Sequence, residues 1–137
     1  IGPAEQGAVM FPTVFQTLKA STAVKNIVGT NPPRIYQHGN APQRPDNLAL
    51  SDPYITWFVA SDTPENQLSG TPTTDRSSTQ IDCWHQTSSG IKALATAVRD
   101  AIEPSAHMTA INADLREAET GLFRVSMTFD WFVNRAY

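Results

Sequence analysis

The chain has 137 residues, of which 40% are hydrophobic and 17% charged, with a formal net charge of −3 at pH 7. This composition is typical of a single folded domain, and no apolar run approaches the ~20 residues that cross a bilayer. No stripe of lysine and arginine is present, which argues against tight nucleic-acid binding. The start lacks a signal-peptide pattern, and we expect a flexible arm over residues 1–10 before one domain over residues 11–137.

A helix, a second and shorter helical turn, and a strand are expected in the first part of the domain. The stretch MFPTVFQTLKASTAVKNIVG places apolar residues at helical spacing, namely Phe11, Val14, Phe15 and Leu18. Ser21 is a suitable cap for a second, shorter turn that carries Val24, Ile27 and Val28, and Gly29 is a typical end. The stretch PPRIYQHG then predicts a short strand after a pair of prolines.

The middle of the chain alternates strand signals with turn formers. YITWFVAS, residues 54–61, has the composition of a strand, and so does TQIDCWHQ, residues 79–86. Between them, residues 61–78 consist almost entirely of turn formers and polar groups, which indicates a long loop. After the second strand, Ser88 or Ser89 can cap a helix that ends at Pro104. Its apolar stripe is Ile91, Leu94, Ala95, Val98 and Ile102.

The last third gives the clearest pattern. HMTAINADLREAE is expected to be extended, and LFRVSMTFDWFVN alternates strictly between two faces. One face carries Phe123, Val125, Met127, Phe129, Trp131 and Val133. The other carries Leu122, Arg124, Ser126, Thr128, Asp130 and Phe132. The element order predicts an α+β fold in which two main helices pack on one face of an antiparallel sheet, with the long loop between two of its strands.

Cys83 is the only cysteine, and it lies two positions before His85. In a strand, Ile81, Cys83 and His85 share the face that meets the helices, and Asp82 and Trp84 share the other. A free cysteine in such a place is typically a buried apolar residue. A nucleophile would need an orienting group and an oxyanion hole, and a structural zinc would need four ligands; the sequence marks neither. We therefore predict no catalytic residue, no cofactor and no metal site.

With its elements in this order, the chain resembles the tail-completion or tail-terminator proteins of long-tailed bacteriophages. The resemblance covers about residues 11–133. It rests on VFQTLKASTAVKNIVG leading into RIYQHGNAPQ, followed by DPYITWFVAS, TQIDCWHQTSSGIKALATAVRDAI and ETGLFRVSMTFDWFV. The chain departs from that pattern in a longer arm before Met10 and in the Thr/Ser/Pro-rich segment 61–78.

The resemblance implies a structural virion protein, made in the host cytoplasm, that forms a hexameric ring at the neck of the tail. Such a ring caps the tail tube and joins it to the head-side connector, and DNA passes through its lumen without specific binding. We expect segment 61–78 to reach the lumen or a neighbouring ring through Asp62, Glu65, Asp75 and Arg76. A partly apolar outer sheet face, with Trp84, Leu122 and Phe132, would contact neighbouring subunits.

Three alternatives remain open from the sequence. Within structural proteins, the chain could be a head-tail connector adaptor or a tail-tube ring subunit. From another class, it could be a small hydrolase that uses Cys83 and His85, in which case the thiol would react rapidly and have a depressed pKa. A binder of single-stranded nucleic acid would show salt-dependent affinity.

Overall fold

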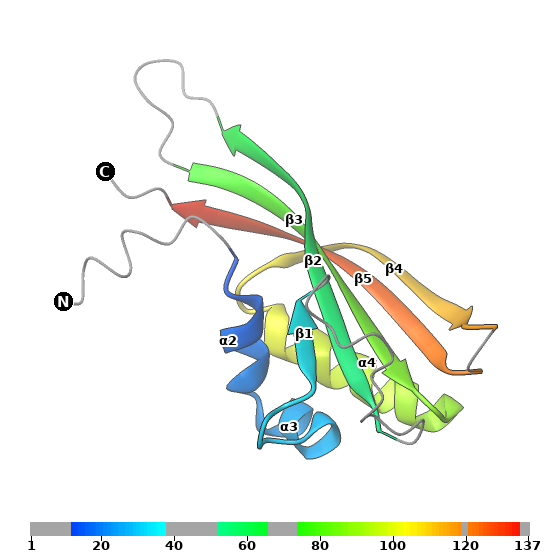
Figure 1. The fold of residues 1–137 in the computed structure, drawn as a ribbon. Coiled ribbons are helices and arrows are strands. Elements are labelled where there is room, and N and C mark those ends of the chain that lie inside the picture. The colour runs from blue at the N-terminus through cyan, green and yellow to red at the C-terminus, as the bar shows by residue number, and fades with distance from the viewer. Residues whose placement is uncertain (1–11, 38–51, 66–73, 119–120, 135–137) are drawn as a thin grey trace.

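The computed structural model describes residues 12–37, 52–65, 74–118 and 121–134. A five-stranded sheet in the order β1-β2-β3-β5-β4 carries the helices on one face (Figure 1). The helices are α2 (Val14–Lys19), α3 (Thr22–Val28) and α4 (Ser88–Ile102). The strands are β1 (Ile35–Gln37), β2 (Tyr54–Glu65), β3 (Thr74–His85), β4 (His107–Arg116) and β5 (Phe123–Asn134). The predicted α+β class, with a mainly antiparallel sheet, is confirmed.

The N-terminal helical segment is divided into two short helices, α2 and α3, where one helix with a second, shorter turn was expected. Val14 and Leu18 on α2 are fully buried. Ser21 caps α3, because its Oγ accepts a 3.2 Å hydrogen bond from the backbone N–H of Val24. Gly29 ends α3 with a φ of 89°, a conformation that side chains other than glycine rarely adopt. Phe11, which we expected on the first helix, lies outside the described residues.

One strand pair is parallel, which the prediction of an antiparallel sheet did not include. β1 runs alongside β2 with Ile35 opposite Ile55, whereas the β2–β3, β3–β5 and β4–β5 pairs are all antiparallel. A parallel pair needs a long crossover connection, and residues 38–53, between β1 and β2, are numerous enough to supply one. The guanidinium of Arg34 joins the surrounding elements by donating to the carbonyl oxygens of Pro53 and Ile27.

The expected long loop over residues 61–78 is wrong in extent. β2 continues to Glu65 and β3 begins at Thr74, so that the two strands pair as far as the Glu65–Thr74 position. β3 is also paired with β5 along its whole length. Pairing on both sides of a central strand stabilises the extended backbone more than local turn propensity opposes it. The polar residues at the start of β3 are therefore extended. Only residues 66–73 separate the two strands.

The core lies between the sheet and the helices, with α4 packed against β3 and β5 and with α2 and α3 packed against α4. The alternation predicted for β5 is confirmed, since Val125, Met127, Phe129 and Trp131 are all buried. On α4, the buried residues are Ile91, Leu94, Ala97, Val98 and Ile102. Ala97 therefore replaces the half-buried Ala95 of the expected stripe. The cap of α4 is Thr87, not Ser88 or Ser89, and its Oγ1 accepts a 3.0 Å hydrogen bond from the Gly90 N–H.

Candidate functional site

Cys83 is a core residue rather than a reactive thiol. It is fully buried on β3, with Ile55 and Val125 as its neighbours on the adjacent strands. Burial, and secondarily the Asp82 carboxylate, raise the pKa of the Cys83 thiol. A cysteine nucleophile needs the opposite shift, toward a thiolate at neutral pH. The interpretation of Cys83 as a buried apolar residue is therefore confirmed.

His85 ends the same strand and serves the turn into α4. Its Nδ1 accepts a 3.1 Å hydrogen bond from the backbone N–H of Thr87, the cap residue of the helix. Partial burial lowers the pKa of the imidazole, which favours the neutral ring that this acceptor role requires. The ring also lies against Gly90, where a Cβ atom would approach it to 2.0 Å. His85 thus positions the start of a helix.

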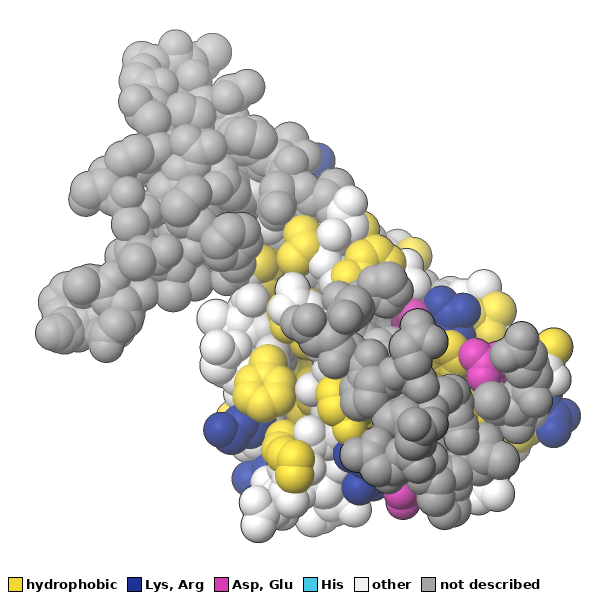
Figure 2. Space-filling view, viewed as in Figure 1, with side chains coloured by type: hydrophobic (Ala, Val, Ile, Leu, Met, Phe, Trp, Pro, Cys, Tyr) yellow, Lys and Arg dark blue, Asp and Glu magenta, His cyan; other side chains and the backbone are white. Residues whose placement is uncertain are grey.

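The part of the chain that the structure describes holds no group of three or more His, Cys, Asp or Glu residues that could bind a metal ion. Within the same residues, no helix is both long and apolar enough to cross a membrane. Figure 2 shows basic and acidic side chains interspersed over the described part of one face, without a continuous basic patch there.

The outer face of the sheet, opposite the helices, carries a row of aromatic rings. The rings of Tyr54 and Trp84 stack with centroids 5.6 Å apart, and Tyr36 lies 6.4 Å from Tyr54 in a tilted arrangement. The Arg124 guanidinium lies 5.2 Å from the Trp84 ring centroid. The Trp84 Nε1 donates to Thr56 Oγ1 at 3.1 Å. Cross-strand contacts fix these rings, so Trp84 contributes to the stability of the sheet as well as to its surface.

An ion pair beside this row joins a buried carboxylate to a partly exposed guanidinium. Asp82 lies on the outer face and is only 7% exposed, with its Oδ2 3.0 Å from the Nη2 of Arg124. The Gln80 side-chain amide donates to the same carboxylate at 3.0 Å. A carboxylate with several donors is well compensated for its burial. The outer face is therefore ordered and mixed in polarity.

The three residues predicted for this face differ in their exposure. Phe132 is 53% exposed, and Trp84 is half-buried. Leu122 is only 3% exposed, so the expectation that it forms part of the outer interface is wrong. It precedes the first residue of β5 and lies next to a turn in which the Glu117 N–H donates to the Leu122 carbonyl. Strand alternation does not determine its direction there.

The four residues predicted to act through the segment 61–78 lie on the paired far ends of β2 and β3. The strands include the backbones of Asp62, Glu65 and Asp75, whose side chains the structure does not describe. Arg76 is exposed and lies directly opposite Phe132 on β5. The structure thus brings together two residues that we had assigned to separate surfaces. Figure 1 shows that this end of the hairpin reaches beyond the helices.

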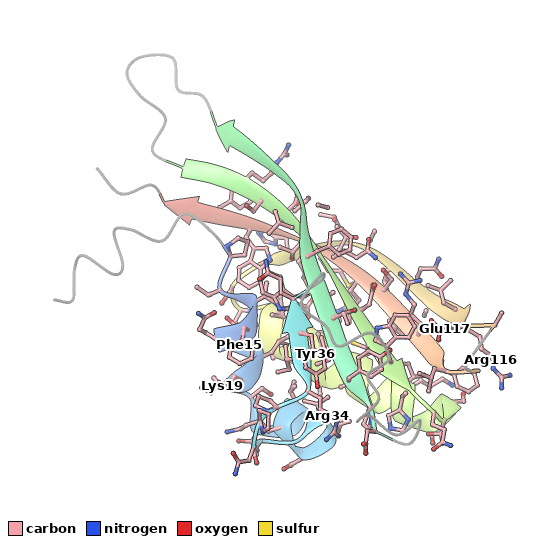
Figure 3. The ribbon with its side chains drawn as sticks, in the orientation of Figure 1. Phe15, Lys19, Arg34, Tyr36, Arg116 and Glu117 are labelled. Atoms are coloured by element: carbon pink, nitrogen blue, oxygen red, sulfur yellow. The ribbon has the colours of Figure 1, made fainter. Side chains whose placement is uncertain are left out.

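A groove between α4 and β4 has no counterpart in the sequence predictions. It has a volume of about 500 Å³, and its apolar lining includes Ile91 and Ala95 from α4 and Ile111 and Leu115 from β4. Arg116 lies at one end of it, with its guanidinium 4.8 Å from the Phe123 ring centroid (Figure 3). The sequence gives little indication of this groove. The groove forms because α4 packs on β3 and β5 and leaves β4 to one side, and local sequence does not encode that arrangement.

Comparison with known proteins gives a consistent result. A family model described as "Tail completion protein gp17" matches residues 12–134. Among solved structures, a chain of the "Virion of native gene transfer agent (GTA) particle" is similar with a TM-score of 0.62 and 21% identity, over 88% of this chain and 91% of that one. No curated protein matches. At this identity the structural likeness shows the fold, and the family match spans every described helix and strand.

Proposed function

The chain belongs to the tail completion protein gp17 family, and on that premise we propose that it is the ring subunit that caps a finished tail tube and joins it to the head-side connector. The family makes it a structural protein of a phage tail and a component of the virion. The observation that carries the proposal is the match over residues 12–134, which runs from before α2 to the end of β5. We place the ring in the neck, after synthesis of the chain in the host cytoplasm.

The sheet leaves surfaces that neighbouring subunits would cover. β4 is one edge, and at the other edge β1 pairs only with Ile55, Thr56 and Trp57 of β2. Edge strands with free backbone groups favour pairing with other chains unless they are protected. A closed ring built from one repeated heterologous contact supplies such protection, and we propose a hexamer.

We further propose that the far end of the β2–β3 hairpin faces the lumen or the next ring. This end carries Asp62, Glu65 and Asp75 within twelve-residue strands that project past the helices (Figure 1). A lumen must allow DNA to slide, and acidic groups do not bind phosphate as lysine and arginine do. Arg76 lies opposite Phe132, so in this arrangement it contacts protein and not DNA.

A cap, a connector adaptor and a tube subunit can be distinguished by the step of particle assembly that fails when the chain is missing. We consider phage-producing cells in which the gene for this chain is inactivated and the particles are imaged by electron microscopy. Loss of a cap leaves tubes that exceed their normal length and heads without tails, and the intact chain supplied in trans restores both. Loss of a connector adaptor leaves tails of normal length that are not joined, and loss of a tube subunit leaves no tubes. Normal numbers of joined particles would contradict all three structural assignments.

The hydrolase alternative is disfavoured by the site itself. Burial raises the pKa of the Cys83 thiol, and the Nδ1 of His85 already accepts a hydrogen bond from the Thr87 backbone. A nucleophile and its base must instead reach a substrate and each other.

A further inference from the structure

Two large hydrophobic side chains are exposed in the described residues, Ile111 at 47% and Phe132 at 53%. Each lies in a distinct surface feature, and the two features differ in shape and in charge. Exposed apolar groups that lie in such features often mark a contact with another protein. A ring built from one repeated contact requires two different surfaces on each subunit that fit each other.

The first surface is the groove between α4 and β4. Ile111 projects into it from β4, and Ile91 and Ala95 form its wall on α4. The charged residues that line this groove are Lys92 and Arg116, both basic and both exposed. Its volume of about 500 Å³ is comparable with that of small-molecule sites, which are ~300–1,000 Å³. It is therefore large enough for an aromatic side chain.

The second surface surrounds Phe132, at the other end of β4. Phe132 lines a hollow of about 150 Å³ where α4 turns into β4. The acidic residues of its lining are Glu103 and Asp130, and His107, the first residue of β4, lies opposite Asp130. Arg99 pairs with Glu103 at 3.1 Å on the helix, and Arg76 lies on the far side of Phe132 from this hollow. The charged lining of this hollow is thus two carboxylates, of which Glu103 is paired with Arg99 and Asp130 accepts a hydrogen bond from Ser78 Oγ, whereas the charged lining of the groove is basic.

One copy cannot bring its own two surfaces together. Ile111 is opposite Met127 on the helix-covered face of the sheet, whereas Phe132 alternates with the buried Trp131 and points to the outer face. Phe132 also lies five positions along β5 from Met127, which is about 17 Å at the usual rise of a strand. The contact between the two surfaces must therefore join different molecules.

We propose that Phe132 of each subunit docks in the α4–β4 groove of the next copy, with Glu103 and Asp130 facing Lys92 and Arg116 of that neighbour. This contact buries both exposed hydrophobic side chains at once and joins unlike surfaces, so it propagates from copy to copy and can close into a ring. It rests on the proposed ring function and identifies the surfaces that form the ring.

Cysteine cross-linking of the purified full chain tests the contact. Three variants are compared after mild oxidation, namely Phe132→Cys, Ile111→Cys and the double variant. Cys83 is buried and stays in place in all of them. A head-to-tail contact predicts a ladder of covalent multiples for the double variant, ending at the ring size, and an equal mixture of the single variants should stop at dimers. Dimers from either single variant alone would instead show a two-fold contact and overturn the proposal.

The mass of the unmodified protein separates this inference from the function on which it rests. A double variant that still forms the wild-type ring by mass but yields no ladder overturns the Phe132 contact and leaves the ring intact. A wild-type chain that stays monomeric, both alone and with tail tubes, overturns the ring and the contact with it. A wild-type ring and a ladder of the same size support both.

A charge exchange tests the polar part of the same contact. Lys92 and Glu103 are exposed helix and helix-end residues, so substitutions there should leave the subunit folded. We expect Lys92→Glu or Glu103→Lys to weaken ring formation at low salt, and the double exchange to restore it in part. Ser89→Glu, on an exposed position of α4 outside the groove lining, is the matched control and should have no effect.

Truncation of the aromatic side chain tests the apolar part of the contact. Phe132→Ala should weaken association by roughly 30-fold or more, as expected for a central aromatic anchor. Equal association of all these variants would contradict the contact.

Discussion

The indole Nε1 of Trp131 donates a 2.8 Å hydrogen bond to Thr79 Oγ1, and both side chains are buried between β5 and β3. We expect Trp131→Ala to lower the free energy of unfolding by roughly 3–5 kcal/mol, the usual cost of removing a buried aromatic side chain. Trp131→Phe keeps most of the apolar volume but leaves the Thr79 hydroxyl without its donor, so it should cost about 1–3 kcal/mol. Denaturant unfolding of the isolated subunit measures both changes.

Phe129→Ala should match the alanine variant of Trp131, because Phe129 is fully buried on the same face. Thr128→Ala, on the opposite face of the same strand, is the control and should cost much less. If Phe129→Ala unfolds like the wild type, the helix-covered face of the sheet has been assigned wrongly.

Gly90 and His85 should be energetically coupled. Alanine normally stabilises a helix interior by ~1 kcal/mol over glycine. At position 90, however, the added Cβ would meet the His85 ring and displace it from the Thr87 N–H. We expect Gly90→Ala to be neutral or destabilising alone and stabilising in a His85→Ala background. A double-mutant cycle from urea unfolding gives the coupling, and additive effects would contradict this contact.

Cys83 should react only when the protein opens. Because burial raises the pKa of its thiol, we expect alkylation of the folded subunit to be slow and to speed up with denaturant in parallel with unfolding. The folded thiol holds its proton above the ordinary pKa of 9.0, where the unfolded thiol ionises. Stability should therefore fall as the pH rises above that value. Rapid labelling of the native protein at neutral pH would revive the hydrolase interpretation.

Cys83→Ser should cost on the order of 1–3 kcal/mol, because it places a hydroxyl in an apolar environment. Assembly of the folded protein should be unaffected, which particle counts can check. Failure of assembly with normal unfolding would give the cysteine a role that its position in the core does not explain.

Several elements could be predicted because they depend on neighbours in the chain. The Ser21 cap and the Gly29 end are local signals, and the buried face of β5 follows from simple alternation. The burial of Cys83 follows from its place among apolar strand residues. The family resemblance added what no single pattern could, since each motif alone is only an apolar run with a few turn residues.

Other features depend on contacts between distant segments, which local sequence does not encode. Residues Thr74 to Ser78 read as turn formers, yet they are extended because β2 and β5 flank them on both sides. Thr87 caps α4 in place of Ser88 because His85 holds its backbone N–H. Ile111 gives no signal of its own, since its exposure arises from the position of β4 beyond the helix.

The end of the β2–β3 hairpin should matter for assembly and not for folding. We expect replacement of residues 66–73 by a tight turn to leave unfolding unchanged, because both strands and the core residues are retained. Ring docking on the tube should fail if this end contacts the lumen or the next ring. A serine and glycine replacement of the same length separates the effect of length from that of sequence. Wild-type numbers of infectious particles from the shortened chain would contradict this role.

Electron microscopy of intact particles carrying a tagged copy of this chain tests the central claim most directly. The tag should follow the C-terminal residue and be visible as added density. We predict a single ring of density at the head-proximal end of the tail tube, with hexameric symmetry and with the sheet and helices of the described residues fitting each repeat. Density along the length of the tube, or none at the junction with the head, would contradict the account.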